Sequence, residues 1–171
     1  MKTITRFALT TVAALTLVST VSAAQNSATT SATATANIVS PIAISNSGPL
    51  NFGDVVATAL LGTVVVGPGS GRTSTGGTFL GSSAGVSAAA FTVTGATGYA
   101  YTVSFPLSPI SITGPGAATM SVDTFTSNPA TSNGLLTGGT QALTVGGTLH
   151  VAANQPLGAY SGLFNVTVTY N

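Results

Sequence analysis

Short runs with an apolar side chain at every second position dominate this chain, and they constrain its fold more than any other feature. The clearest are residues 86–95 (VSAAAFTVTG), 99–105 (YAYTVSF) and 142–151 (ALTVGGTLHV). This period is typical of a strand with one buried face, because successive side chains of a strand point to opposite sides. Clusters of Gly, Pro, Asn and Ser separate the runs and indicate turns. Beyond the N-terminal region, no stretch of ten or more residues has the spacing of a helix.

Further runs bring the expected total to about nine short strands: residues 32–38, 41–45, 62–67, 108–113 and 118–126. This number of strands, with turns at this spacing, predicts an all-β fold, an immunoglobulin-like antiparallel β-sandwich with no helix after the N-terminal region. The Gly- and Ser-rich stretch 67–85 is expected to pack poorly and to hold one hairpin around Thr78 to Leu80.

The N-terminus has the layout of a secretory signal peptide. Lys2 and Arg6 precede an apolar stretch from Phe7 to Val18, and small residues follow around Ser22 to Ala24. The apolar stretch is shorter than the roughly 20 residues that span a bilayer. We therefore expect a signal peptide at 1–23, cut after Ala23 or Ala24, and no membrane insertion after cleavage. The mature protein is expected in the periplasm, on the outer surface or outside the cell.

Cleavage leaves very few charged side chains: Arg72, Asp54 and Asp123, with the single histidine His150. Nucleic acids and anionic membranes are bound by clusters of Lys and Arg, so neither is an expected partner. The chain has no cysteine. Removing 23 of its 171 residues leaves 148, which suits one domain. We place that domain at 39–171 and assign 24–38 as an N-terminal extension or a first strand.

The last residues of the chain read as a strand. Tyr160, Phe164, Val166, Val168 and Tyr170 fall on one face, while residues such as Ser161 and Thr167 fall on the other. An ordinary final strand of a sandwich explains this pattern. Its open edge would still need protection, because unpaired N–H and C=O groups template pairing with other chains.

The mature N-terminus alternates in a similar way, with Ala32, Ala34, Ala36 and Ile38 on one side, up to the interruption at Ser40 and Pro41. Such a segment is either the domain's own first strand or an arm that adds itself to an open edge of a neighbouring molecule.

The C-terminal pattern resembles that of pilins assembled by the chaperone–usher pathway. In that family a glycine lies fourteenth from the end and the penultimate residue is tyrosine, positions that Gly158 and Tyr170 occupy here. The resemblance implies a pairing strand for a subunit or periplasmic chaperone at Gly158, Tyr160, Phe164, Val166, Val168 and Tyr170. It implies a donor arm at Ala32, Ala34, Ala36 and Ile38.

Over nearly its whole mature length, the chain resembles a family of bacterial secreted proteins known as domain-of-unknown-function family 4402. The matching stretches include ATANIVSPIAI, LNFGDV, LTVGGTLHVAANQPLGAYSG and FNVTVTYN. This resemblance implies export and a β fold.

The sequence argues against an enzyme. GSSAG at 81–85 matches the nucleophile elbow of α/β-hydrolases at Ser83, and Asp123 and His150 follow in the matching order. That elbow needs a helix after the serine, whereas a strand-like run follows here. Two carboxylates and one histidine also make a metal site hard to assemble, so no catalytic residue, metal or cofactor is expected.

Two functions remain open from sequence. The first is a non-enzymatic structural protein on the surface of a Gram-negative bacterium, a pilus- or fimbria-like subunit that assembles by β-strand addition. The alternative is a self-complete secreted sandwich that binds a glycan or surface partner. Sugar sites usually stack sugars on exposed aromatic rings, so an exposed Tyr99 or Tyr101 in a concave surface would favour the alternative.

Overall fold

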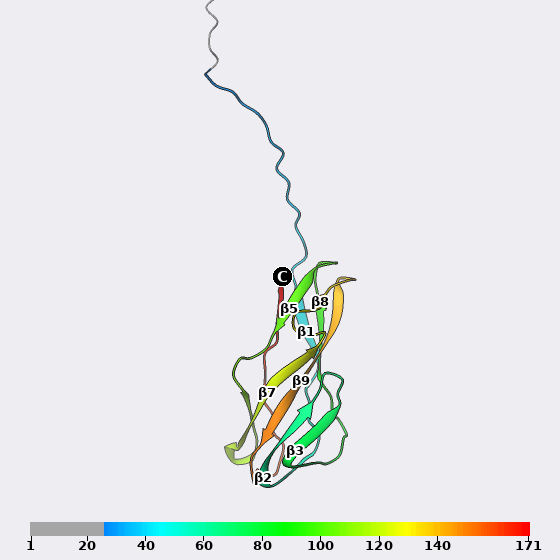
Figure 1. Cartoon of the computed structure of the whole chain (residues 1–171), viewed down its shortest axis with the longest axis vertical. Helices are drawn as coiled ribbons and strands as arrows, with labels where there is room; N and C mark the ends of the chain where they lie inside the picture. Colours follow the sequence, from blue (N-terminus) through cyan, green and yellow to red (C-terminus); the bar gives the residue numbers. More distant parts are fainter. Residues whose placement is uncertain (1–25) are drawn as a thin grey trace, which may run out of the picture. The chain divides into compact units, whose positions relative to one another are not determined.

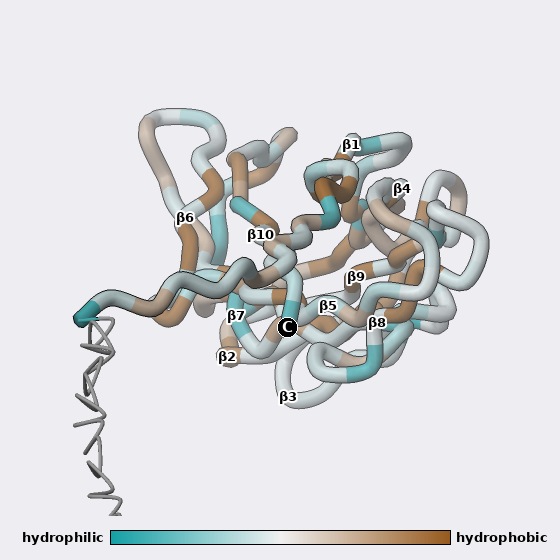
Figure 2. The backbone as a smooth tube through the Cα atoms, turned by 90° about the horizontal axis from the view of Figure 1, so that it is seen from above, coloured by the Kyte–Doolittle hydropathy of each residue, from teal (hydrophilic) through white to brown (hydrophobic). Residues whose placement is uncertain are grey.

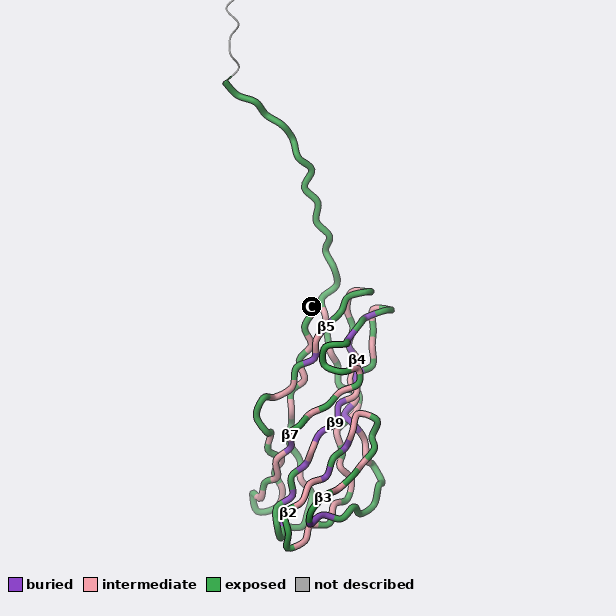
Figure 3. Tube along the Cα trace, in the orientation of Figure 1, coloured by how far each residue is buried: buried purple, intermediate pink, exposed green. Residues whose placement is uncertain are grey.

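A computed structural model describes residues 26–171. The expected signal peptide and its cleavage site lie outside these residues. The chain divides into two units, 1–37 and 38–171. In the first unit, the described residues 26–37 form neither strand nor helix, and each of these residues is exposed (Figure 3). Within 26–171, no helix has the length and apolar character needed to cross a bilayer.

The second unit is built from ten strands and one short 3-10 turn (Figure 1). Every strand pair is antiparallel, and the strands form a seven-stranded sheet and a three-stranded sheet. The prediction of an all-β sandwich is therefore confirmed. The strands are β1 Ala43–Gly48, β2 Val55–Val66, β3 Arg72–Leu80, β4 Ala89–Thr94, β5 Ala100–Ser104, β6 Ile110–Thr113, β7 Thr119–Asn128, β8 Gly134–Leu135, β9 Thr140–Val151 and β10 Thr167–Tyr170; the turn is Pro115–Ala117.

Strand β9 organises the larger sheet. Its first half pairs with β4 and its second half with β2, while β7 pairs with both halves. β1 lies beside β4, β3 beside β2, and β6 beside β7. The smaller sheet has the order β10-β5-β8. Apolar residues recur along the strands instead of gathering in one segment (Figure 2).

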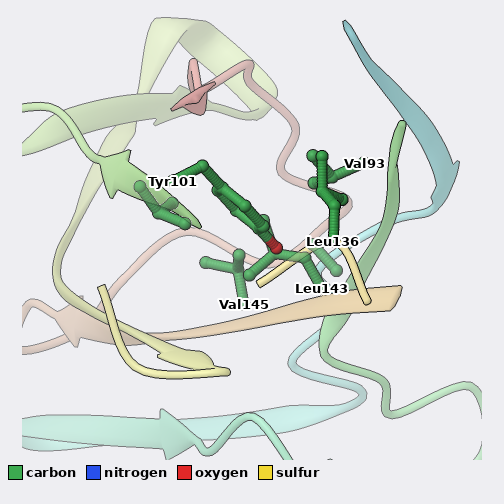
Figure 4. Packing of buried hydrophobic residues seen from close by; sticks show 7 residues of the cluster. Val93, Tyr101, Leu136, Leu143 and Val145 are labelled. Carbon is green, nitrogen blue, oxygen red and sulfur yellow. The ribbon is translucent and has the colours of Figure 1, made fainter. Parts of the chain in front are cut away.

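The first core cluster lies between the two sheets. Tyr101 of β5 is fully buried against Val93, Leu143 and Val145 of the larger sheet and against Leu136 (Figure 4). The Tyr101 hydroxyl donates to Gln141 Oε1 at 2.8 Å, so its polar atom is satisfied. Burial raises the pKa of this hydroxyl.

The second core cluster is formed by Val64, Val122, Leu149 and Val151, which lie on β2, β7 and β9 of the larger sheet. None of the apolar residues packed around it belongs to the smaller sheet. The smaller sheet therefore covers one half of the larger sheet, and other segments must cover the second half.

Three expectations about individual elements were wrong. Residues 32–38, which were expected to form a strand, form none in the described part of the chain. The stretch 67–85 packs better than expected, because Arg72–Leu80 is the strand β3, its Thr78 is buried, and the turn of the hairpin lies at 67–71. The final strand is shorter than its alternation suggested, since ladder pairing begins only at Thr167. The two-residue strand β8 is too short to leave a periodic signal.

Candidate functional site

A groove of about 930 Å³ opens over the second core cluster. Its floor is apolar and comes from the inner face of the larger sheet. The floor residues are Ile110, Ile112, Met120, Val122, Leu149 and Val151. In strands β6, β7 and β9 these side chains take alternate positions, as a half-buried strand requires. No strand of the second layer covers this floor. Val122, Leu149 and Val151 are nevertheless buried, whereas Ile110, Ile112 and Met120 remain partly exposed.

The first wall of the groove is the segment 49–57, where all residues except Val56 line it. The segment is held from its far side. Asn51 and Ser87 exchange backbone hydrogen bonds of 2.9 and 3.1 Å, and the Asp54 N–H donates to the Ser82 carbonyl. The Asn51 side chain accepts from the Gly53 N–H at 2.8 Å and stabilises the turn there.

Arg72 fixes the same wall from β3. Its Nη1 donates to the carbonyls of Phe52 and Asp54, at 2.7 and 3.0 Å. Its Nη2 donates to the carbonyls of Gly81 and Ser82, at 3.0 and 3.1 Å. One guanidinium therefore joins two loop segments, which is a use that the planar, multi-donor group of arginine suits.

The second wall is the continuous segment 155–164, and all ten residues line the groove. Ser161 exchanges backbone hydrogen bonds of 2.8 and 3.0 Å with Thr113 at the end of β6. The Tyr160 ring lies over Gly114, where a Cβ would come within 2.5 Å of the ring. The Tyr160 hydroxyl donates to the Pro156 carbonyl and accepts from Gln155 Nε2.

Beyond Ser161, the second wall has few backbone partners. Outside the strand ladders, no backbone–backbone hydrogen bond involves residues 162–166 within the described part of the chain. Leu157 and Leu163 line the groove yet are 92% and 91% exposed. The wall therefore combines free N–H and C=O groups with large apolar side chains in water, both of which favour pairing with another segment.

Five of the six predicted pairing residues are half-buried, Gly158 being the exception, and only some of the six line the groove. Gly158, Tyr160 and Phe164 line the groove, whereas Val166, Val168 and Tyr170 do not. The face formed by Phe164, Val166, Val168 and Tyr170 packs against the first core cluster. Gly158 is exposed with a φ of 141°, a conformation that favours glycine.

Two aromatic residues of this face have partners of their own. Phe164 stacks on Phe125, with ring centroids 4.9 Å apart, and meets the edge of Phe91 at 6.4 Å. The Tyr170 hydroxyl accepts from the Ala96 N–H at 2.6 Å and donates to the Ser40 carbonyl at 3.0 Å. Both residues therefore also stabilise the domain itself.

The predicted donor residues Ala32, Ala34, Ala36 and Ile38 are all exposed, Ile38 at 95%. The sequence analysis did not predict the groove or the lack of backbone partners at residues 162–166 of the final segment. The alternation of Ile110, Ile112, Met120 and Val122 predicted their burial, but nothing in a sequence tells whether a second layer is complete. Leu163 is an apolar residue on the otherwise polar face of its run. This was the one feature of the sequence that could have indicated a binding surface there.

The residues that resembled a hydrolase triad are differently placed. Ser83 is followed by a turn and then by β4. His150 Nε2 donates to Asp123 Oδ1 at 2.8 Å, which lowers the pKa of Asp123. Tyr101 is buried, and Tyr99, although 41% exposed, does not line the groove.

A family model described as "Domain of unknown function (DUF4402)" matches residues 42–170. No curated protein and no solved structure matches the chain.

Proposed function

Because the chain belongs to the family described as Domain of unknown function (DUF4402), whose description names no activity, we propose its function from the geometry of the groove. We propose that the protein is a non-enzymatic, exported structural subunit of the cell surface that assembles by β-strand addition. An incoming strand would lie in the groove and pair with the second wall.

The open groove over the second core cluster is the observation that carries this proposal. A strand laid along it would cover the part of the floor that is still partly exposed, namely Ile110, Ile112 and Met120. It would also remove the rim residues Leu157 and Leu163 from water, and both changes are a favourable transfer of apolar area. Its main chain would supply partners for residues 162–166. These are the two contributions that β-strand addition combines, namely main-chain pairing for affinity and alternate side chains for specificity.

The incoming strand would be residues 32–38 of a second copy. Within 26–171 this segment has strand-like alternation without a strand partner. Its Ala32, Ala34, Ala36 and Ile38 would face the floor, while Thr33, Thr35 and Asn37 would face water. Pro41 marks where pairing ends, because proline has no N–H to donate.

We infer export from the signal-peptide pattern at 1–23, and export supports assembly outside the cytoplasm. A subunit with an open groove needs protection before assembly, because a free edge invites aggregation. A periplasmic chaperone that pairs with the second wall would provide it.

A gel of material sheared from expressing cells, loaded unheated and boiled, tests assembly. We expect an unheated ladder of multiples that collapses to one band on boiling. Leu163→Asp should abolish the ladder, because it would bury an unpaired charge at the rim once a strand binds. Leu163 is a sharper position than Phe164 or Val166, which contact the core as well.

Leu107→Asp is the matched control, since Leu107 is fully exposed and does not line the groove. Its ladder should equal that of the wild type. A single monomer band for the wild type in both lanes would contradict the proposal, and so would a ladder that Leu163→Asp leaves intact.

A further inference from the structure

The outer face of the larger sheet, on the side opposite to the groove floor, carries a straight row of polar side chains. In β2 and β9, the floor and core residues Val64, Leu149 and Val151 point inward, so their neighbours Thr63 and His150 point outward. Residues on this face stay in water when the groove is filled.

Cross-strand register aligns five of these side chains. Thr75 is opposite Thr63, Thr63 is opposite His150, His150 is opposite Ser121, and Ser121 is opposite Ser111. We call Thr75, Thr63, His150, Ser121 and Ser111 the hydroxyl row. Since neighbouring strands lie about 4.8 Å apart, the row is on the order of 19 Å long.

Hydrogen bonds hold several members of the row in place. Thr63 and Thr75 share a hydrogen bond of 2.7 Å between their hydroxyl oxygens. His150 donates to Asp123, which also accepts from the Thr124 hydroxyl at 2.9 Å. Side chains that are already ordered lose less conformational entropy when a ligand binds.

One end of the row borders a hollow of about 320 Å³, which is lined by Thr63, Thr75, His150 and Leu61 among others. Two glycines that line the hollow let β2 and β3 approach each other closely there. A Cβ at Gly76 would come within 2.5 Å of the Leu61 carbonyl oxygen, and one at Gly62 within 2.7 Å of the Thr75 carbonyl oxygen. Leu61 is 73% exposed and gives the hollow an apolar side.

The chemistry of this face restricts what it can bind. The interior strands β2, β7 and β9 are paired on both edges, so the middle of the row, at Thr63, His150 and Ser121, offers no free backbone to a peptide strand. The one arginine of the described residues, Arg72, donates its hydrogen bonds to four carbonyls. Among the described residues, this face therefore has no arginine or lysine that could bind a phosphate group or a nucleic acid. Hydroxyls, an imidazole and a carboxylate instead match a neutral ligand that is rich in hydroxyl groups.

We propose that the hydroxyl row and the adjoining hollow bind a neutral glycan, with Asp123 holding His150 and with Leu61 providing the apolar contact in place of an aromatic ring. The length of the row suits an oligosaccharide chain. The site does not depend on strand addition, because it uses the opposite face of the sheet.

Binding of the purified mature protein to an array of defined neutral oligosaccharides tests the proposal. We expect selective binding to a subset of them. Thr75→Val and His150→Ala should each weaken it at least tenfold. Thr94→Val is the matched control, because Thr94 is an exposed threonine of β4 outside the row. It should bind like the wild type.

Thermal unfolding and the boiled-against-unheated ladder should be the same for Thr75→Val, Thr94→Val and the wild type. If a variant loses glycan binding but keeps the ladder, the loss is therefore due to the hydroxyl row and not to a failure of folding or of strand addition. No binding by the wild type would overturn the proposal, as would binding that survives both Thr75→Val and His150→Ala.

Discussion

At the scale of single residues, Arg72 shows how one side chain can define a wall of the groove. Its four carbonyl acceptors lie on residues 52, 54, 81 and 82, so it joins segments that are distant in sequence. Asp54 and Asp123 are the only carboxylate side chains of the chain. In the described residues, Asp123 accepts a hydrogen bond from His150, and Arg72 donates to carbonyls instead of to either aspartate. Charge alone predicts carboxylate partners, but the loop geometry placed carbonyls within reach.

Replacing Arg72 with Met should destabilise the domain by roughly 3 kcal/mol, because hydrogen bonds to charged groups contribute more than neutral ones. Arg72→Lys should recover part of the loss, since an ammonium keeps the charge but not the planar set of donors. Urea unfolding measures both. Thr73→Met, an exposed neighbour on the same strand, is the control and should change stability by less than about 0.5 kcal/mol. An unchanged midpoint for Arg72→Met would refute this role.

At the scale of elements, strand β9 was the best predicted part of the chain. Its alternation named Leu143, Val145, Leu149 and Val151 as core residues, and all four are buried. The final segment was predicted less well, because alternation reports which face is buried and not whether the backbone has a partner. Residues 160–166 keep the predicted alternation without forming a ladder.

Gly146 allows β9 to pass close to the end of β2. A Cβ there would come within 2.2 Å of the Val66 carbonyl oxygen, a backbone atom that cannot move cheaply. Gly146→Ala should therefore cost about 2 kcal/mol or more. Gly138→Ala is the matched control, since a Cβ at Gly138 would meet no atom within 4 Å. Urea unfolding should separate the two variants, and equal stabilities would argue against a close approach.

At the scale of the whole molecule, composition and periodicity were enough to predict an all-β sandwich. They could not predict the open groove, because the same apolar residues would be expected in a complete sandwich. Whether the sandwich is complete depends on whether residues 32–38 pair within their own domain or with another copy. The alternation of Ala32, Ala34, Ala36 and Ile38 is compatible with either kind of pairing.

The absence of cysteine in the chain allows a direct test of what fills the groove. Ala34→Cys in one preparation and Leu163→Cys in another can be mixed, allowed to assemble and oxidised. Because each chain then has one thiol, a disulfide between the two variants can form only between copies. Leu107→Cys in place of Leu163→Cys gives the background of random oxidation.

The account predicts a covalent dimer that contains one chain of each variant, well above the Leu107→Cys background. The contrary result would be no mixed dimer above that background, together with an internal disulfide when both substitutions are placed in one chain. That outcome would mean that the segment closes its own domain, and that the protein does not assemble by strand addition.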